Sequence, residues 1–173
     1  MIKQKMVDAL NKQVIEEAYS SNLYLSMASW CEIQGLAGCS DFMYIHAMEE
    51  RDHMMKIFRY INEMDGKAIV PAIPQPPVDF ESIQDVFEST YEHEQKITAC
   101  INDLVALCNE LEDFATLGFL QWFVEEQREE EATFKEILDK MKLIGDGPQS
   151  LYYIDMEIEK INGKAHADSG AAE

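Results

Sequence analysis

The chain has 173 residues, a length that suits a single domain with a sizeable hydrophobic core. Its formal net charge is −19, from 33 acidic and 14 basic residues, which argues against nucleic acid or an anionic membrane as the main partner and favours cations. It has neither a signal-peptide core nor an apolar run that could span a bilayer, so we expect a cytoplasmic location. The four cysteines form no C-x-x-C pair and are expected to be buried free thiols.

The first two predicted elements are long amphipathic helices. The first spans about 5–33 and is ended by Gly35 and Gly38. The second runs from 39 or 40 to about 65. Residues spaced by three and four form one stripe on each helix. These stripes are Leu10, Val14, Glu17, Ser21, Tyr24, Ala28 and Cys31 on the first, and Phe42, His46, Glu50, His53, Ile57, Ile61 and Met64 on the second.

The segment 66–81 separates this pair from the helices that follow. It holds four of the five prolines, so we expect an extended connection that reaches about 45 Å at about 3.1 Å per residue. A helix of about 27 residues is about 40 Å long. The segment is therefore long enough to return along a whole helical bundle.

Two more long helices follow this connection. Asp79 or Ser82 can cap the third helix, which runs to about 111, and Asp113 can cap the fourth, which runs to about 144. Their stripes are Phe87, Thr90, Glu94, Ile97, Ile101, Leu104 and Cys108 on the third, and Leu120, Phe123, Gln127, Glu130, Phe134, Ile137 and Met141 on the fourth.

A short fifth helix is predicted from Pro148 to Ile161. Residues 163–173 are small and polar, and we expect a disordered tail there. No strand alternation of useful length is found. The predicted fold is therefore all-α, a four-helix bundle over residues 1–162 with a long crossover between its second and third helices and a short fifth helix.

Each long stripe is apolar except near its middle. The polar members are Glu17 and Tyr24 on the first helix, Glu50 and His53 on the second, Glu94 on the third, and Gln127 and Glu130 on the fourth. Counted from the connections near residues 36 and 111, five of these groups lie 16 to 19 residues away. At about 1.5 Å per residue, they fall within about one turn of a common height.

Four carboxylates at one level in a dry core would repel each other unless cations neutralised them. Oxygen-rich ligands with one imidazole suit iron or manganese, and would also take zinc. Glu50 belongs to an E-x-x-H pair with His53 and is the natural bridge between two metals. The alternative is structural, because a single histidine on an apolar face is usually a hydrogen-bonded core residue. We interpret His46 in that way, and expect His93 and His166 on the surface or in the tail.

A second acidic group consists of Glu49, Glu126 and Glu129, with Glu130 beside them. On their helices these residues adjoin the core ligands and face a different direction. They are candidates for another metal site just outside the pair. The alternative is a solvated face, because the whole run 125–131 is rich in acidic residues.

From Met1 to about Asn162 the chain resembles a bacterial non-haem ferritin. The resemblance is carried by Glu17 with Tyr24, by His46-Ala47-Met48-Glu49-Glu50 with His53, by Tyr91-Glu92-His93-Glu94-Gln95, and by Phe119-Leu120-Gln121-Trp122-Phe123 with Glu126-Gln127 and Glu129-Glu130-Glu131. Ferritin-like di-iron proteins, which are a standard example of a metal site inside a helical bundle, carry two E-x-x-H motifs. This chain has Gln127-x-x-Glu130 in the second place. That departure is typical of bacterial non-haem ferritins and argues against bacterioferritin and rubrerythrin. Asp52 stands where a bacterioferritin has its haem-ligating methionine, so we expect no haem.

The resemblance implies a ferroxidase centre that oxidises Fe(II) with dioxygen or hydrogen peroxide. One iron would bind Glu17, Glu50 and His53, and the other Glu50, Glu94 and Glu130. Gln127 would contribute only a neutral oxygen or an amide donor. Tyr24 is implied as a catalytic side chain that hydrogen-bonds a ligand or supplies an electron, and Trp122 is a weaker candidate for the same electron supply.

The resemblance also implies that Glu49, Glu126 and Glu129 form a third iron site. Fe(III) would be stored as an oxyhydroxide mineral in a hollow shell of twenty-four subunits, with the fifth helix along a fourfold axis. Three other functions stay open from the residues alone. They are a di-iron or di-manganese oxidase or peroxidase that stores no mineral, a passive binder of divalent metal, and a bundle with incidental carboxylates.

Overall fold

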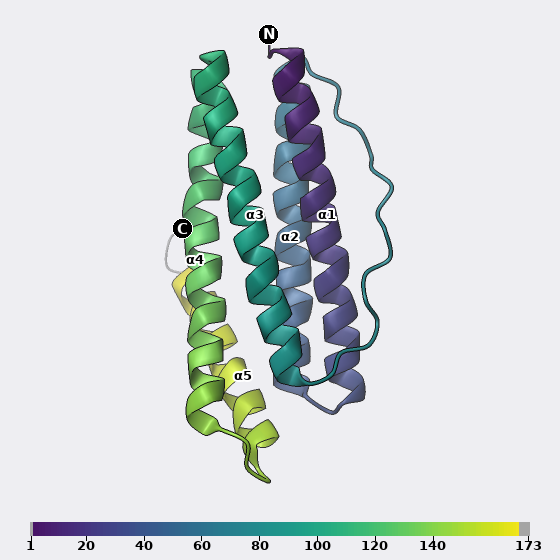
Figure 1. The fold of residues 1–173 in the computed structure, drawn as a ribbon, viewed down its shortest axis with the longest axis vertical. Helices are drawn as coiled ribbons and strands as arrows, with labels where there is room; N and C mark the ends of the chain where they lie inside the picture. The colour runs from purple at the N-terminus through teal and green to yellow at the C-terminus, as the bar shows by residue number, and fades with distance from the viewer. Residues whose placement is uncertain (1, 170–173) are drawn as a thin grey trace.

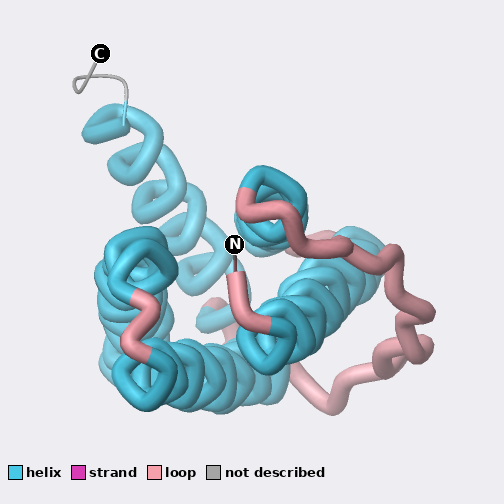
Figure 2. Tube along the Cα trace, turned by 90° about the horizontal axis from the view of Figure 1, so that it is seen from above, coloured by secondary structure: helices cyan, strands magenta, loops and turns pink. Residues whose placement is uncertain are grey.

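The computed structural model describes residues 2–169, with side chains described as far as Asn162. Within that range every regular element is helical. The helices are α1 (Gln4–Ile33), α2 (Ala37–Glu63), α3 (Ile83–Leu111), α4 (Phe114–Ile144) and α5 (Ser150–Ser169). The four long helices surround a common axis and α5 lies to one side (Figures 1 and 2). The prediction of an all-α bundle with a fifth helix is confirmed.

Side-chain caps set where two of the helices begin. The hydroxyl of Ser82 accepts a hydrogen bond from the backbone N–H of Asp85 at 3.0 Å, so Ser82 rather than Asp79 caps α3. The carboxylate of Asp113 accepts from the N–H of Thr116 at 3.1 Å and caps α4 as predicted. Each cap satisfies a backbone donor that has no partner inside its own helix.

Residues 64–82 form the crossover, which follows the outside of α1 from one end of the bundle to the other (Figure 1). Hydrogen bonds attach it to α1 at both ends. Asn11 donates to the carbonyl of Lys67 at 3.0 Å, and Ser26 donates to the carbonyl of Pro77 at 2.6 Å. The crossover therefore brings α3 into the bundle parallel to α2, and its length matches the extended conformation predicted for 66–81.

The core consists of two hydrophobic clusters stacked along the bundle axis. One contains Met27, Phe42, Phe87 and Phe134, all fully buried, and the other is built around Leu10, Ile57, Ile97 and Phe123. The buried polar residues of the predicted site lie along the helices between them. This arrangement surrounds the polar layer with apolar side chains on both sides and excludes water from it.

The C-terminal helix is longer than the sequence suggests. It continues through residues 163–169, where a disordered tail is expected, and residues 170–173 lie outside the described range. Gly163 alone does not end the helix because good helix formers, Lys164, Ala165 and Ala167, follow it. The carboxylate of Asp155 on α5 accepts from the N–H of Cys39 at 2.8 Å, so α5 caps the beginning of α2.

All four cysteines are free thiols, as expected. Cys31, Cys39 and Cys108 are buried, whereas Cys100 is only partly covered. Burial raises the pKa of Cys31 to about 12 and that of Cys108 to about 11, so these thiols stay protonated at neutral pH. Their role is to pack in the core.

Gly38 lies inside α2 and does not end α1, contrary to the prediction. A Cβ at this position would lie 2.4 Å from the carbonyl oxygen of Asp155 and 3.1 Å from the Cβ of Glu159. Glycine is therefore required here because the backbone of α5 approaches α2 closely. This contact between distant segments leaves no local signal in the sequence.

Gly38→Ala should displace α5 and lower the free energy of unfolding by about 1–3 kcal/mol, the usual range for overpacking. Chemical denaturation followed by circular dichroism measures the change. Gly118→Ala on α4 is the matched control, since nothing lies within 4 Å of its added Cβ. That control should be neutral or more stable by up to about 1 kcal/mol. Equal stabilities for the two variants would contradict the packing argument.

Candidate metal centre

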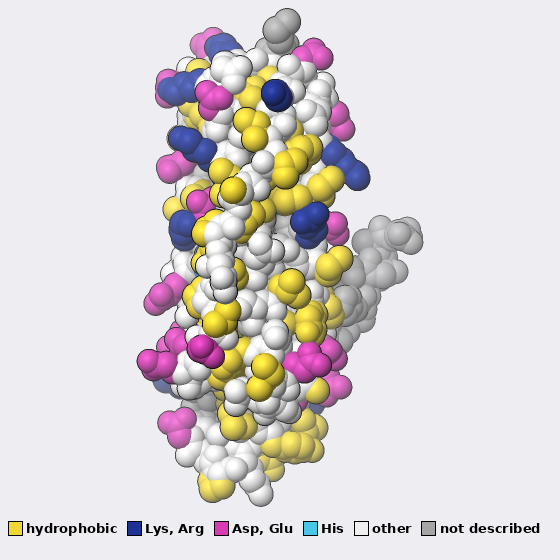
Figure 3. Space-filling view, turned by 90° about the vertical axis from the view of Figure 1, so that its right-hand side faces the viewer, with side chains coloured by type: hydrophobic (Ala, Val, Ile, Leu, Met, Phe, Trp, Pro, Cys, Tyr) yellow, Lys and Arg dark blue, Asp and Glu magenta, His cyan; other side chains and the backbone are white. Residues whose placement is uncertain are grey.

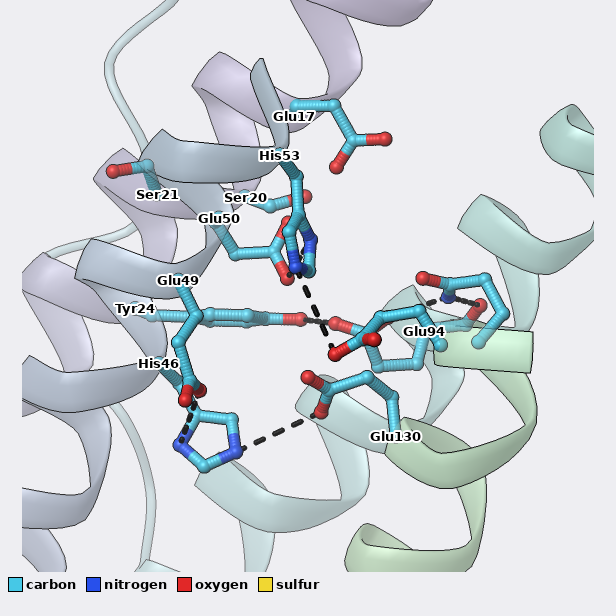
Figure 4. A network of polar contacts seen from close by, with 12 residues as sticks. Glu17, Ser20, Ser21, Tyr24, His46, Glu49, Glu50, His53, Glu94 and Glu130 are labelled. Atoms are coloured by element: carbon cyan, nitrogen blue, oxygen red, sulfur yellow. Dashed lines mark hydrogen bonds and ion pairs between the residues drawn. The ribbon is translucent and has the colours of Figure 1, made fainter. Parts of the chain in front are cut away.

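Four helices each contribute at least one polar side chain to the layer between the two core clusters. Their exposed fractions are 7% or less: Glu17 from α1, Glu50 and His53 from α2, Glu94 from α3, and Gln127 and Glu130 from α4. Figure 4 shows most of these side chains converging on one region. Further along the bundle, Tyr60 of α2 stacks on Phe119 of α4 with 3.8 Å between the ring centroids.

Glu17, Glu50 and His53 form one group of potential metal ligands. One ligand atom from each lies within 4.8 Å of the others. Gln13 donates from its amide to Oε1 of Glu17 at 2.9 Å, while Nδ1 of His53 lies 3.5 Å from Oε1 of Glu50. The second carboxylate oxygens of Glu17 and Glu50 are buried with no hydrogen-bond partner. Unpartnered buried oxygens of this kind fit a cation, because leaving them bare is unfavourable.

Glu94 is oriented by two donors, one at each carboxylate oxygen. The Tyr24 hydroxyl donates to Oε1, and the Gln127 amide donates to Oε2 at 2.8 Å. Gln127 therefore acts as an amide donor that positions the carboxylate of Glu94. Tyr24 is fully buried and its phenol group has the same orienting role.

The carboxyl groups of this layer strongly favour protons when no cation is present. Burial raises the pKa of Glu17, Glu50 and Glu130 well above the usual value. Neighbouring carboxylates raise it further, Glu50 acting on Glu17 and Glu94 acting on both Glu50 and Glu130. Burial also raises the pKa of Glu94, against the opposing effect of its two donors. A divalent ion would reverse these shifts by replacing the protons.

Two histidines that we expected to be structural or at the surface have specific partners. His46 lies beside the centre, with Nε2 3.6 Å from Oε2 of Glu130 and Nδ1 3.8 Å from Oε2 of Glu49. His93 is half-buried, and its Nε2 lies 2.8 Å from the Ser20 hydroxyl. Burial lowers the pKa of His93 to about 4. The side chain of His166 lies outside the described residues.

The second acidic group is not assembled as a trio. Glu49 faces His46, and Oε1 of Glu126 lies 3.9 Å from Nε2 of His53. Glu129 is 71% exposed and lies 4.0 Å from Arg128, and its charge and that of Glu49 both help to raise the pKa of Glu126, after the larger effect of burial. Among the described residues, the sets of close potential ligands therefore combine Glu49 with His46 and Glu130, and leave Glu126 and Glu129 apart.

Trp122 lies at the edge of the layer. Its ring centroid is 5.3 Å from that of His53, and the ammonium of Lys56 lies 3.5 Å above the indole ring. The side chain is 38% exposed. A nearby cation disfavours removal of an electron from the indole, so this contact weakens Trp122 as an electron donor.

Carboxylates from four helices and one imidazole meet in this buried layer, and two of the carboxylate oxygens lack a hydrogen-bond partner among the described residues. This arrangement fits hard metal ions and is typical of ferritin-like proteins. The family model described as the Ferritin-like domain matches residues 7–144. The chain belongs to the ferritin family. None of its described helices is long and apolar enough to cross a membrane.

Individual relatives are similar along nearly their whole length. A bacterial non-heme ferritin of Campylobacter jejuni is 47% identical over 161 residues, which is 93% of this chain and 96% of the relative. A probable bacterial non-heme ferritin-like protein of Haemophilus influenzae is 44% identical over 165 residues, 95% of this chain and 100% of the relative. Among solved structures, an open pore ferritin from the archaeon Archaeoglobus fulgidus superposes with a TM-score of 0.89 at 43% identity, covering 92% of this chain and 98% of that one.

The resemblance to bacterial non-haem ferritins stated from the sequence is thus confirmed. The family, the fold and the carboxylate and histidine ligands together fit iron storage with oxidation of iron.

Proposed function

We propose that this chain takes up Fe(II), oxidises it at a di-iron centre inside the subunit and stores the product as ferric oxyhydroxide. One Fe(II) binds Glu17, Glu50 and His53, and the second binds Glu50, Glu94 and Glu130. The pair of unpartnered oxygens on Glu17 and Glu50 is the observation that carries this proposal. Those two atoms are buried and have no hydrogen-bond partner among the described residues, and a cation would compensate them in place of protons.

The oxidation needs two electrons at one place, and the centre supplies them by holding two substrate ions together. Each Fe(II) gives one electron, so a pair reduces one dioxygen, with two protons, to the level of hydrogen peroxide. Carboxylates favour this direction because the hard Fe(III) ion prefers charged oxygen ligands. The Fe(III) product then takes oxygen from water and releases protons as it becomes oxyhydroxide. Hydrogen peroxide is an alternative oxidant for the same pair.

The two ions are held unequally. The first has an imidazole and the second has only carboxylates, since Gln127 donates its amide to Glu94 and offers no nitrogen lone pair. The second ion should therefore be bound more weakly and leave first. No haem is part of this proposal, because Asp52 provides no thioether sulfur.

Tyr24→Phe should slow oxidation by about 10- to 100-fold, the usual effect of losing a partner that orients a metal ligand. The variant removes only the hydroxyl that donates to Glu94 and keeps the buried ring. Stopped-flow absorbance of the ferric product measures the rate. Tyr152→Phe, at a 65% exposed position on α5, is the control. Equal oxidation rates for the two variants would contradict a role for Tyr24 in the centre.

Glu49, Glu126 and Glu129 remain the proposed third iron site on the strength of the family resemblance. Glu129→Ala should change the iron released or the oxygen consumed per iron more than it changes the initial oxidation rate. Oxygen electrode traces and ferrous chelator assays measure these quantities together. An unchanged profile in both would exclude Glu129 from any iron site.

Assembly into a closed shell of twenty-four subunits is proposed on the same resemblance, supported by unusual apolar exposure. Val70 on the crossover is 82% exposed, Leu143 is 83% exposed and Phe114 is 73% exposed. Apolar side chains also gather on the face that carries the crossover (Figure 3). Surfaces of this kind indicate partner contacts, here with further copies of the chain.

One experiment tests the whole proposal. Fe(II) is added to the metal-free protein without oxygen, oxygen is then admitted, and uptake is recorded while the products are separated by size. The proposal requires oxygen uptake together with ferric iron that elutes with a very large assembly. Uptake without retained iron would indicate an oxidase or peroxidase that stores nothing. Metal binding without uptake would indicate a passive binder.

A further inference from the structure

Gln13 is a buried amide on α1 that is not among the ligands of the proposed centre. Its exposed fraction is 3%, and it is a neighbour of the fully buried Leu10 and Val14 on the same helix. Burying an amide is unfavourable unless it forms hydrogen bonds, whereas a leucine or methionine here would extend the apolar stripe of α1. The polar side chain at this position therefore needs a specific explanation.

The amide of Gln13 is directed at a proposed metal ligand. Its Nε2 donates to Oε1 of Glu17 at 2.9 Å, and both side chains are buried. The two residues are four apart on one helix, so the helix itself keeps the amide and the carboxylate on the same face. Because an amide N–H can only donate, this hydrogen bond favours the ionised carboxylate that a metal ion requires.

The same hydrogen bond makes the two oxygens of Glu17 unequal. Oε1 accepts from Gln13, whereas Oε2 is buried with no hydrogen-bond partner among the described residues. A cation is therefore expected at Oε2, with Glu17 binding it through that one oxygen. Without the donor, the carboxylate would be free to rotate and to offer both oxygens to the ion.

A second glutamine has the same relation to a ligand of the other ion. Nε2 of Gln127 on α4 donates to Oε2 of Glu94 on α3 at 2.8 Å, and Gln127 is also 3% exposed. Glu17 and Glu94 reach the polar layer from different helices (Figure 4). Each proposed ion therefore has a carboxylate ligand that is oriented by its own buried glutamine.

We propose that Gln13 is a positioning residue that makes Glu17 a one-oxygen ligand and sets the affinity of the first ion. Gln127 has the corresponding role for the second ion through Glu94, so the two affinities are set by separate side chains. This inference rests on the proposed function for the positions of the two ions and for the identity of the natural ion. Its test needs no oxidation of iron.

The test uses Zn²⁺ as a redox-inert probe on the full-length, metal-free protein. Gln13→Met keeps an unbranched buried side chain and removes the donor. By titration calorimetry this variant should bind the first ion about 10- to 100-fold more weakly and change the second much less. Gln127→Met should show the opposite pattern. Gln95→Met, at an exposed position on α3, is the control and should change neither affinity.

Crystals soaked in Zn²⁺ supply a readout that a general loss of packing would not produce. Anomalous peaks at limiting zinc assign each affinity to its position. In the wild type, zinc should bond to Oε2 of Glu17 while Oε1 still accepts from the Gln13 amide. In Gln13→Met, the carboxylate of Glu17 should rotate and bind zinc with both oxygens.

Three outcomes would overturn the inference. The first is a wild-type crystal in which Glu17 binds no zinc or leaves Gln13 to do so, a result that requires no variant to fold. The second is a Gln13→Met protein with wild-type affinity for the first ion. The third is equal weakening of both ions in that variant. A wild-type protein that shows the expected zinc geometry and oxidises no iron would refute the proposed function alone.

Discussion

Glu50→Ala should lower the initial rate of Fe(II) oxidation by about 100-fold or more, since losing even an outer partner of a metal ligand costs 10- to 100-fold. Glu50 is the carboxylate that both ions share in the proposed centre. It lies next to Glu17 and His53 on one side, and the charge of Glu94 acts on it from the other. Without it, neither ion has a full set of ligands and the two are no longer held together.

Stopped-flow absorbance and oxygen uptake measure this loss under identical iron loading. Glu92→Ala is the control, because Glu92 is an exposed carboxylate on α3 close in sequence to the centre. It changes the charge of the protein equally without touching the layer. If Glu50→Ala oxidises iron at the wild-type rate, the centre is assigned to the wrong residues.

The second large effect concerns stability. An ion that binds only the folded chain adds about 2.7 kcal/mol at a concentration 100 times its dissociation constant. Two ions at the di-iron centre should therefore raise the melting temperature markedly in Zn²⁺ over the value in a chelator. Differential scanning calorimetry measures the difference. Glu17→Ala, which removes a ligand of one ion, should lose a large part of it.

The pH dependence of the metal-free protein follows from the same carboxyl groups. Because burial raises the pKa of Glu17, Glu50 and Glu130, the folded chain binds their protons more tightly than the unfolded chain does. Their contribution is fully present below the unfolded pKa of about 4.3 and is lost as the pH rises through the folded values. The free energy of unfolding should thus fall as the pH rises above that point. With Zn²⁺ bound the slope should reverse, and proton release on binding, followed with an indicator dye, provides a direct check. A metal-free protein that becomes more stable across this range would contradict the raised pKa values.

Most of the architecture follows from periodicity and helix caps. The stripes that contain Leu10, Phe42, Phe87 and Phe134 form the core, because apolar residues recur along each of them with the period of an α-helix. The common height of the polar residues could be predicted by counting residues along each helix, because each residue adds about 1.5 Å. Asp113 capped its helix because the capping signal is local. All of these features depend on short stretches of chain.

The features that sequence reasoning missed depend on contacts between helices. His46 is the buried, hydrogen-bonded core residue that the sequence predicts, with Nδ1 2.9 Å from the carbonyl oxygen of Phe42, but only the packed bundle brings it to 3.6 Å from Glu130 on α4. His93 is covered by contacts with Ser20 and the rings of Tyr19 and Tyr24 on α1. No local signal exists for Gly38.

The crossover divides the chain into two helical hairpins, α1 with α2 and α3 with α4, whose contacts are mostly their own. Each hairpin supplies about half of the ligands, Glu17, Glu50 and His53 from the first and Glu94 and Glu130 from the second. Local contacts let each hairpin collapse early, yet neither can gather a pair of ions until it docks on the other. In the proposed centre the first hairpin alone could therefore hold one ion at most, and the paired transfer of two electrons would have to wait until both hairpins have docked.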